Sequence, residues 1–269
     1  MPLQSFLEIR GRVPRWASVV LGSIPIVSIF LLWWIFTTGP SEARTISPTI
    51  LPSPVEVVQS ILELVTSRDL LHHIRASVQR VGLSFLLALA IVIPIGILMG
   101  AFGSVSALFT PMSTASGYIP IATLVPLTMS WFGIDELQKT IFLAMAFGIY
   151  LLPLVVNAIE SVPEIYLRTS YTLGASRLDA IRHVLIPIAL PEIWHSMRLA
   201  FGVGWTYIVL AEVAVMVDGL GFLIQNSFRR GPREHIYLVI LVITLIAWAA
   251  DLLWQYLGKI LFPYRQEST

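Results

Sequence analysis

The stretch VGLSFLLALAIVIPIGILMGAFGSVSALFTPMSTASGYIPIATLVPLTMSWFGI runs from Val81 to Ile134 without one Asp, Glu, Lys, Arg or His. About 20 apolar residues in a helix cross the hydrocarbon core of a bilayer, which is about 30 Å thick. Residues 81–134 are therefore too many for one crossing and suit two crossings joined by a short link. Turn-forming residues between Gly103 and Pro111 place that link near 104–111.

The composition of the whole chain agrees with a membrane protein. Of its 269 residues, 56% are hydrophobic and 12% are charged, and the mean hydropathy is +0.81. Soluble domains carry about 25% charged residues. The net charge of +1 offers no broad basic surface for nucleic acid. The absence of cysteine excludes a disulfide framework, a thiolate metal site and a cysteine nucleophile.

Further apolar runs complete an all-α, polytopic chain of about six membrane-spanning helices. The first apolar run, residues 16–36, is too long for the apolar region of a signal peptide, which has roughly 7–15 residues. We therefore expect it to be an uncleaved first membrane-spanning helix. Residues 1–269 are expected to form a single transmembrane domain. The six crossings are predicted at about 16–36, 79–102, 112–132, 139–160, 197–218 and 236–257.

The basic residues predict the orientation, because Lys and Arg concentrate in cytoplasmic loops. Segment 1–15 and the loop 161–196 are rich in arginine, so both are expected in the cytoplasm together with the C-terminus. Segment 37–78 is then external and is expected to contain an amphipathic helix after its prolines. Loop 219–235, also external, departs from the rule; its arginines could attract an anion or an acidic protein, or could simply be solvated. They are Arg229, Arg230 and Arg233.

The loop 161–196 has a helical pattern of its own. Residues 165–173 favour a first short helix, which Gly174 would end in the left-handed conformation. Ser176 is suited to cap a second helix, with Asp179 at the reciprocal position of a capping box. Pro187 and Pro191 are expected to end that second helix. An amphipathic pair of helices at the membrane surface suits a partner protein, although a loop folded back on the helix ends would give the same pattern.

This loop resembles the EAA loop of permeases from ABC importers. That pattern has Glu-Ala-Ala, three residues, Gly, nine residues, Ile, one residue and Leu-Pro. Counted from Gly174, Val184 holds the Ile position and Ile186-Pro187 the Leu-Pro position. The chain departs from the pattern at its start, where Arg168, Thr169 and Ser170 replace Glu-Ala-Ala. The resemblance implies a type I importer (MetI-like) fold and contact with an ATPase by Glu164, Arg168, Thr169, Ser170, Leu173, Gly174, Ala175, Ser176 and Pro187.

Other short strings are similar to the nitrate, sulfonate, taurine and bicarbonate branch of this family. They are Leu51-Pro52-Ser53-Pro54, Ser77-Val78-Gln79-Arg80-Val81-Gly82 and Gly219-Leu220-Gly221. The resemblance implies a bacterial inner-membrane permease that works with a second permease copy or paralogue, two ATP-binding cassette subunits and an external solute-binding protein. The solute would be a small anion such as nitrate, bicarbonate, taurine or another sulfonate. The chain lacks a phosphate-binding loop, so ATP and Mg²⁺ are expected on the partner, with no cofactor here.

Polar residues within the apolar spans are the candidates for a translocation path. They are Tyr118, Thr123, Thr128, Ser130 and Glu212. Glu212 could act as a gate or helix lock, or could be a neutral packing group. Prolines beside the others could equally mark kinked structural helices. His72 and His73 lack further ligands at suitable spacing, so no metal site is expected.

Two other classes of membrane protein compete with this interpretation. An ion-coupled secondary transporter would be expected to carry paired halves and a relay of ionisable groups within the membrane. Glu212 is the clearest deep carboxyl group in this sequence. A membrane-embedded hydrolase would need a nucleophile and a base on facing helices, and the sequence offers no defensible set. The absence of an enzymatic site of its own is therefore the expectation.

Overall fold

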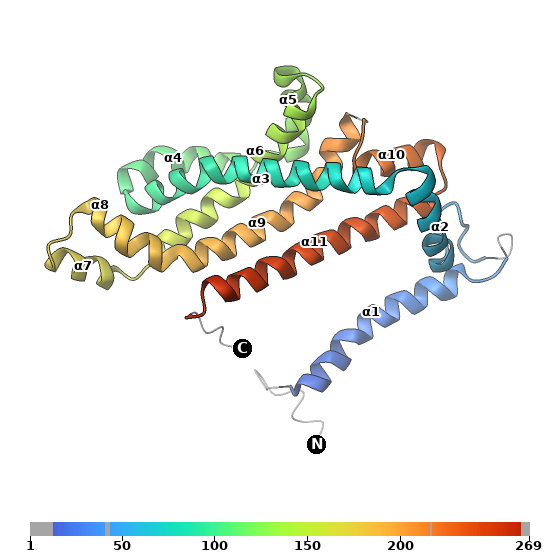
Figure 1. Ribbon diagram of the computed structural model, residues 1–269, viewed down its shortest axis with the longest axis horizontal. Helices are drawn as coiled ribbons and strands as arrows, with labels where there is room; N and C mark the ends of the chain where they lie inside the picture. Colours follow the sequence, from blue (N-terminus) through green and yellow to red (C-terminus); the bar gives the residue numbers. More distant parts are fainter. Residues whose placement is uncertain (1–12, 41–43, 216, 265–269) are drawn as a thin grey trace.

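The computed structural model describes residues 13–40, 44–215 and 217–264, and this part of the chain is built of helices (Figure 1). Arg10, Arg12 and Arg265, which contributed to the predicted orientation, lie outside the described residues. The helices are α1 (Arg15–Thr37), α2 (Pro54–Ser67), α3 (Leu70–Ala101), α4 (Gly103–Ser116), α5 (Leu124–Phe132), α6 (Glu136–Glu160), α7 (Glu164–Thr172), α8 (Arg177–Ala180), α9 (Ile186–Ala214), α10 (Leu220–Arg230) and α11 (Glu234–Leu261). A 3-10 turn (Ile121–Thr123) precedes α5, and a π-helical turn (Ile181–Leu185) joins α8 to α9.

Five of the described helical segments are long and apolar enough to cross a membrane. They are α1, α3, α6, the continuous run Arg177–Ala214 and α11. The segment from Ile121 to Phe132 is a shorter apolar helix. The predicted all-α, polytopic architecture is therefore confirmed, with five long candidate spans and one shorter apolar helix among the described residues.

Helices α3, α6 and α9 pack along one another and form the core, and α11 packs against α9 and α10 (Figure 1). Small residues allow the close approach of α3 and α6. A Cβ atom added to Gly96 would lie 2.6 Å from Val155 Cγ1, and one added to Gly100 would lie 2.6 Å from Ile159 Cβ. The two glycines of this Gly-x-x-x-Gly sequence in α3 thus lie in the contact with α6, as such glycines often do in membrane helices.

The bundle has two distinct ends (Figure 1). Helices α7 and α8 project at one, called here the α7–α8 end, whereas α2 and α10 cover the other, called here the α2–α10 end. Helix α1 lies apart from the bundle over most of its length, and none of its most apolar window is buried. It is attached near its end, where Trp33 Nε1 donates a hydrogen bond to the Pro52 carbonyl at 2.9 Å. The apolar sides of α1 therefore remain for lipid or a second protein.

The prediction of a single third crossing at 112–132, after a link at 104–111, is wrong. The chain already reverses at Phe102, whose extended backbone (φ −125°, ψ 112°) separates α3 from α4. Residues 104–111 are helical, and the helix instead ends at Ser116. Pro120 explains the break, because proline has no N–H and disfavours the helical conformation of the residue before it. A reversal needs only one extended residue, so the glycine and serines after Phe102 remain in the helix.

The expected end of the second loop helix near Pro187 is also wrong. Helix α8, the π-helical turn and α9 form one run from Arg177 to Ala214, so the boundary placed at residues 196–197 does not exist. Within that turn the N–H of Ile186 bonds to the carbonyl of Ile181, five residues back. Pro187 then occupies the first turn of α9, where its missing N–H is tolerated.

The amphipathic helix predicted within 37–78 is α2. Its buried side is formed by Pro54, Val57, Ser60 and Leu64, whereas Val58 and Leu62, which share its apolar pattern, are exposed. Helix α3 begins at Leu70 rather than near 79 and has 32 residues. At about 1.5 Å per residue it is roughly 48 Å long, which exceeds the roughly 30 Å of a hydrocarbon core. Its first turns therefore extend beyond the apolar layer.

Candidate functional site

The segment from α7 to α8 has a fixed geometry. Gly174 adopts φ +87°, the conformation expected for it, and the N–H of Ala175 bonds to the Ser170 carbonyl at 3.0 Å. The N–H of Gly174 bonds to the Tyr171 carbonyl at 3.0 Å, which completes a Schellman motif. The predicted capping box is also present: the Asp179 N–H donates to Ser176 Oγ, and the Ser176 N–H donates to the Asp179 carboxylate. These bonds fix the angle between the two helices.

Several large apolar side chains of this segment are exposed. Leu173 is 83% exposed and Leu178 is 74% exposed, and Ile165, Tyr166 and Tyr171 are exposed as well. They lie at the α7–α8 end, beyond the long apolar helices (Figure 1). Exposed apolar groups that gather on one element are typical of protein-binding surfaces.

The residues at the Glu-Ala-Ala positions lie on α7. Arg168 Nη2 is 2.9 Å from Glu164 Oε2, four residues earlier, and both side chains are 70% exposed. Arg168 therefore has an acidic partner within its own helix. Thr169 is exposed, whereas Ser170 is buried and bonds to the carbonyl of Leu167. Beneath α7, a groove of about 240 Å³ separates Leu167 and Tyr171 from the corner between α3 and α4.

The α2–α10 end contains a buried ionic cluster centred on Arg80, whose side chain is 5% exposed. Arg80 Nε and Nη2 bond to the two carboxylate oxygens of Glu136 at 2.6 and 2.7 Å. Arg80 Nη1 bonds to Glu212 Oε1 at 2.7 Å, and Nη2 bonds to Asp218. Lys139 Nζ adds a bond to Glu136 at 2.8 Å. One guanidinium thus joins α3, α6, α9 and the chain that follows α9.

The same cluster caps the start of α10. Three successive N–H groups are satisfied by side chains: Gly219 donates to His73 Nδ1 at 2.9 Å, Leu220 to Ser77 Oγ at 2.9 Å, and Gly221 to Glu212 Oε2 at 2.8 Å. A carboxylate at a helix N-terminus is favoured by the helix dipole. Because Nδ1 of His73 accepts this bond, that nitrogen carries no proton.

The approach of Gly219 and Gly221 to Glu212 leaves no room for a side chain. A Cβ atom on Gly219 would lie 2.2 Å from the Glu212 carboxyl carbon, and the residue has φ +103°. A Cβ atom on Gly221 would lie 2.7 Å from the Val209 carbonyl oxygen. The Gly219-Leu220-Gly221 string is therefore required by close backbone packing against Glu212.

A second ion pair braces the chain before α2. Arg44 Nη1 and Nη2 bond to the two carboxylate oxygens of Glu56 at 3.0 and 2.9 Å. Glu56 also accepts the N–H of Ser53, completing a capping box at the start of α2. The hydrogen bonds from Arg44 lower the pKa of Glu56 from 4.5 to about 2. The carboxylate is therefore ionised at any physiological pH.

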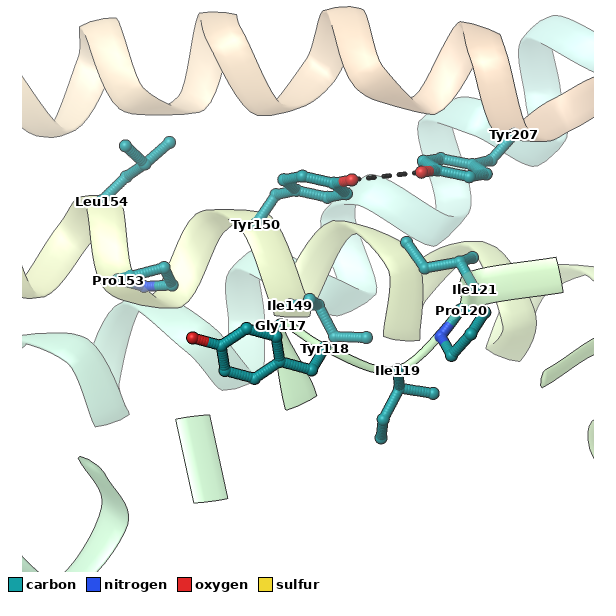
Figure 2. A pocket seen from close by; sticks show the side chains of 10 residues that line it. All are labelled: Gly117, Tyr118, Ile119, Pro120, Ile121, Ile149, Tyr150, Pro153, Leu154 and Tyr207. Atoms are coloured by element: carbon teal, nitrogen blue, oxygen red, sulfur yellow. Dashed lines mark hydrogen bonds between the residues drawn. The ribbon is translucent and has the colours of Figure 1, made fainter. Parts of the chain in front are cut away.

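A cavity of about 580 Å³ lies where the segment between α4 and α5 passes α6 and α9 (Figure 2). Its polar groups are the hydroxyls of Tyr118, Tyr150 and Tyr207. The rings of Tyr150 and Tyr207 are stacked with centroids 6.2 Å apart, and their hydroxyl oxygens are 3.1 Å apart. Figure 2 shows these two hydroxyls pointing toward each other, with Tyr118 on the segment between α4 and α5.

Comparison with known proteins identifies the family. The protein family described as "Binding-protein-dependent transport system inner membrane component" matches residues 92–264, which is well over half of the chain. The chain belongs to this family. It is therefore an ABC-importer permease, and the family resemblance of its loop is confirmed.

Named relatives agree with the family match. The permease is 29% identical over 266 residues to the taurine transport system permease protein TauC of Escherichia coli (strain K12), covering 97% of this chain and 94% of that protein. It is 28% identical over 222 residues to a putative aliphatic sulfonates transport permease protein, SsuC, of Bacillus subtilis (strain 168), covering 82% and 80%. It is 26% identical over 261 residues to the nitrate import permease protein NrtB of Leptolyngbya laminosa, covering 91% and 90%.

Solved structures share the fold of the permease. A chain of the MetNI methionine ABC transporter in an inward facing conformation matches with a TM-score of 0.65 and 17% identity, covering 71% of the permease and 95% of that chain. A chain of a bacterial ABC transporter involved in the import of the acidic polysaccharide alginate matches with a TM-score of 0.56 and 16% identity, covering 90% and 92%. These likenesses support the MetI-like fold.

The structure separates the five residues predicted for the translocation path of the permease. Tyr118 lines the tyrosine cavity. Thr123 and Ser130 are exposed outside that cavity, whereas Thr128 is buried and accepts a hydrogen bond from Gln138 at 2.8 Å. Glu212 belongs to the ionic cluster. Their shared role as path residues stays a prediction.

Sequence reasoning missed the cavity tyrosines on α6 and α9 and most of the ionic cluster. Tyr150 and Tyr207 are polar residues inside charge-free runs, a signal that could have found them. Three charged residues lie at the edges of such runs, where they indicate only the ends of membrane-spanning helices: Arg80, Glu136 and Lys139. Their partners come from other helices, which no local pattern indicates.

Proposed function

We propose that this permease forms the transmembrane path of an ATP-driven importer, paired with a second permease copy or paralogue and served by two ATP-binding subunits. An external solute-binding protein would deliver the solute. The named relatives favour a small oxyanion, with sulfonates such as taurine before nitrate. ATP and Mg²⁺ belong to the partner in this proposal. The bilayer is the bacterial inner membrane, with both termini in the cytoplasm.

The observation that carries the proposal is the exposed apolar surface of α7 and α8. Leu173 and Leu178 are the most exposed large apolar residues of the segment. Seated in a cleft of the ATPase, they would be removed from water. Because α8 continues into α9, a movement of this segment is transmitted to Glu212 and the ionic cluster. Glu164, Arg168, Thr169, Ser170, Gly174, Ala175, Ser176 and Pro187 belong to this coupling element in the proposal.

The pairing within α7 bears on how the ATPase would be contacted. The family pattern has an acidic residue where this chain has Arg168, and Arg168 already pairs with Glu164. An exposed pair of this kind contributes only about 0–1 kcal/mol, so it separates readily. We propose that the ATPase offers an acidic residue to Arg168. Replacing that acid by a basic residue is expected to weaken assembly, and Arg168→Glu is expected to restore it.

Site-directed crosslinking tests the proposed contact, and the absence of cysteine makes single-cysteine variants straightforward. Leu173→Cys in the assembled complex is expected to form a crosslink to the ATP-binding subunit. Leu62→Cys, which is 70% exposed on α2 at the opposite end, is the matched control and is expected to form none. The proposal fails if Leu173→Cys reacts only with reagents added outside the cell, or forms no crosslink in an active complex.

A further inference from the structure

The tyrosine cavity lies at mid-membrane depth. Helix α6 runs from residue 136 to 160, so Tyr150 is 14 residues from one end and 10 from the other. At about 1.5 Å per residue, these separations are roughly 21 Å and 15 Å. A solute that crosses the bilayer has to pass this depth.

The backbone beside the cavity is not helical. Between α4 and the 3-10 turn, residues 117–120 leave the helix, and all four line the cavity. Tyr118 on this segment is 83% exposed. Non-helical backbone at membrane depth is tolerated only when it is buried in protein or lines a watery cavity. The break therefore indicates a hydrated space rather than lipid.

The chemistry of the cavity suits an anion that must be released again. Among the ten lining residues, all of them in the described part of the chain, none is ionisable as an acid or base near neutral pH. The hydroxyls of Tyr150 and Tyr207, 3.1 Å apart, can both direct their protons to one oxyanion. A transport site has to bind weakly enough to release its cargo. Neutral donors meet that condition better than a buried arginine, whose attraction grows as the dielectric falls.

The rest of the cavity lining is apolar and favours a solute with a hydrocarbon part. The apolar lining residues are Ile119, Ile121, Ile149 and Leu154, together with two prolines (Figure 2). A volume of about 580 Å³ is in the range of small-molecule sites. Nitrate would leave this apolar wall without a partner, whereas an alkyl chain would cover it.

We infer that Tyr150 and Tyr207 form a low-affinity transmembrane binding site for short alkanesulfonates, with Tyr118 on the opposite wall. The inference rests on the proposed function and adds a selectivity step inside the permease. The sulfonate oxygens accept hydrogen bonds from the paired hydroxyls, and the alkyl chain lies on the isoleucines.

The test uses the complex of permease and ATP-binding subunit, with ethanesulfonate as the probe and without the binding protein. Saturation-transfer NMR detects weak binding through the protons of the ethyl group. Tyr150→Phe and Tyr207→Phe each remove one hydroxyl and keep the ring. Loss of a hydrogen bond to a charged group is expected to weaken ethanesulfonate binding at least about tenfold. Tyr256→Phe, 64% exposed on α11, is the matched control and is expected to bind as the unaltered complex does.

Each outcome decides one question. Unchanged binding in both Tyr150→Phe and Tyr207→Phe overturns the site, and displacement of ethanesulfonate by an equal concentration of nitrate overturns the ligand class. ATP-driven ethanesulfonate uptake into liposomes, measured with a sulfonate-binding protein, reports separately on the proposed function. If that uptake is intact while the tyrosine variants match the control, the inference fails alone. A complex that hydrolyses ATP and imports no solute overturns the proposed function.

Discussion

Replacement of Arg80 by methionine tests the ionic cluster directly. The guanidinium makes two bonds to Glu136 and one to Glu212, at distances of 2.6 to 2.7 Å. Glu212 has no exposed surface, so water cannot replace the lost cation. After the change, Glu212 keeps the hydroxyl of Ser77 and the N–H of Gly221 but has no positive partner.

The expected loss of stability follows from this burial. Removing one partner of a buried ion pair destabilises a protein by about 3–5 kcal/mol. For a chain of this size, each kcal/mol lowers the unfolding midpoint by about 2–4 °C. Arg80→Met should therefore lower the midpoint by roughly 10 °C. Adding Glu212→Gln removes the unpaired charge and should recover at least half of that loss.

Thermal unfolding of the purified permease in one detergent, followed by tryptophan fluorescence, measures this difference. Arg168→Met is the matched control, because its pair with Glu164 is 70% exposed on both sides and contributes little. The reasoning is refuted if Arg80→Met lowers the midpoint no more than Arg168→Met does. It is also refuted if Arg80→Met/Glu212→Gln is less stable than Arg80→Met alone.

Three further changes test other parts of the structure. A Cβ atom at Gly174 would meet no atom within 4 Å, but the backbone φ of +87° is strained for a branched residue. In Gly174→Val we therefore expect ATP hydrolysis to continue while solute uptake falls several-fold. The control Gly22→Val, in open space on α1, should leave both activities unchanged. Gly100→Val should lower the free energy of unfolding by about 1–3 kcal/mol through overpacking, which is measured as a lower unfolding midpoint. In Gly82→Ala, on the same helix, the new Cβ atom meets nothing within 4 Å and the protein should not be destabilised. Because the folded-state pKa of Glu56 is lowered from 4.5 to about 2, its ion pair stabilises the protein above pH 4.5 and is lost as the pH falls toward 2; the gap in unfolding midpoint between the unaltered chain and Glu56→Gln should therefore close over that window, and a constant gap would contradict the pairing.

Local patterns predicted the elements whose structure is determined locally. The capping box of Ser176 and Asp179 and the left-handed Gly174 were predicted from neighbouring residues, because these bonds form within a few residues. The approximate positions of five long apolar helices followed from the length of a bilayer crossing, although the beginnings of α3 and α9 did not. The family match confirmed the type of protein that the loop spacing indicated.

Features that depend on distant residues were not predictable in this way. Pro187 was expected to end a helix, but a π-helical turn before it lets the helix continue. Glu212 looked like a solitary deep acid, yet Arg80 reaches it from 132 positions earlier. The stacked pair of Tyr150 and Tyr207 requires the packing of α6 on α9, which only the folded arrangement provides.

The unbroken run from Arg177 to Ala214 has a mechanical consequence. Its 38 residues, at about 1.5 Å each, make a helical run roughly 57 Å long along its path. If this run pivots as a unit about its centre by about 5°, each tip is displaced by up to roughly 2.5 Å, in opposite directions. That distance is close to the length of the hydrogen bonds around Arg80. A small movement at the α7–α8 end would therefore be accompanied, at the other end, by a displacement large enough to break the hydrogen bonds of Arg80.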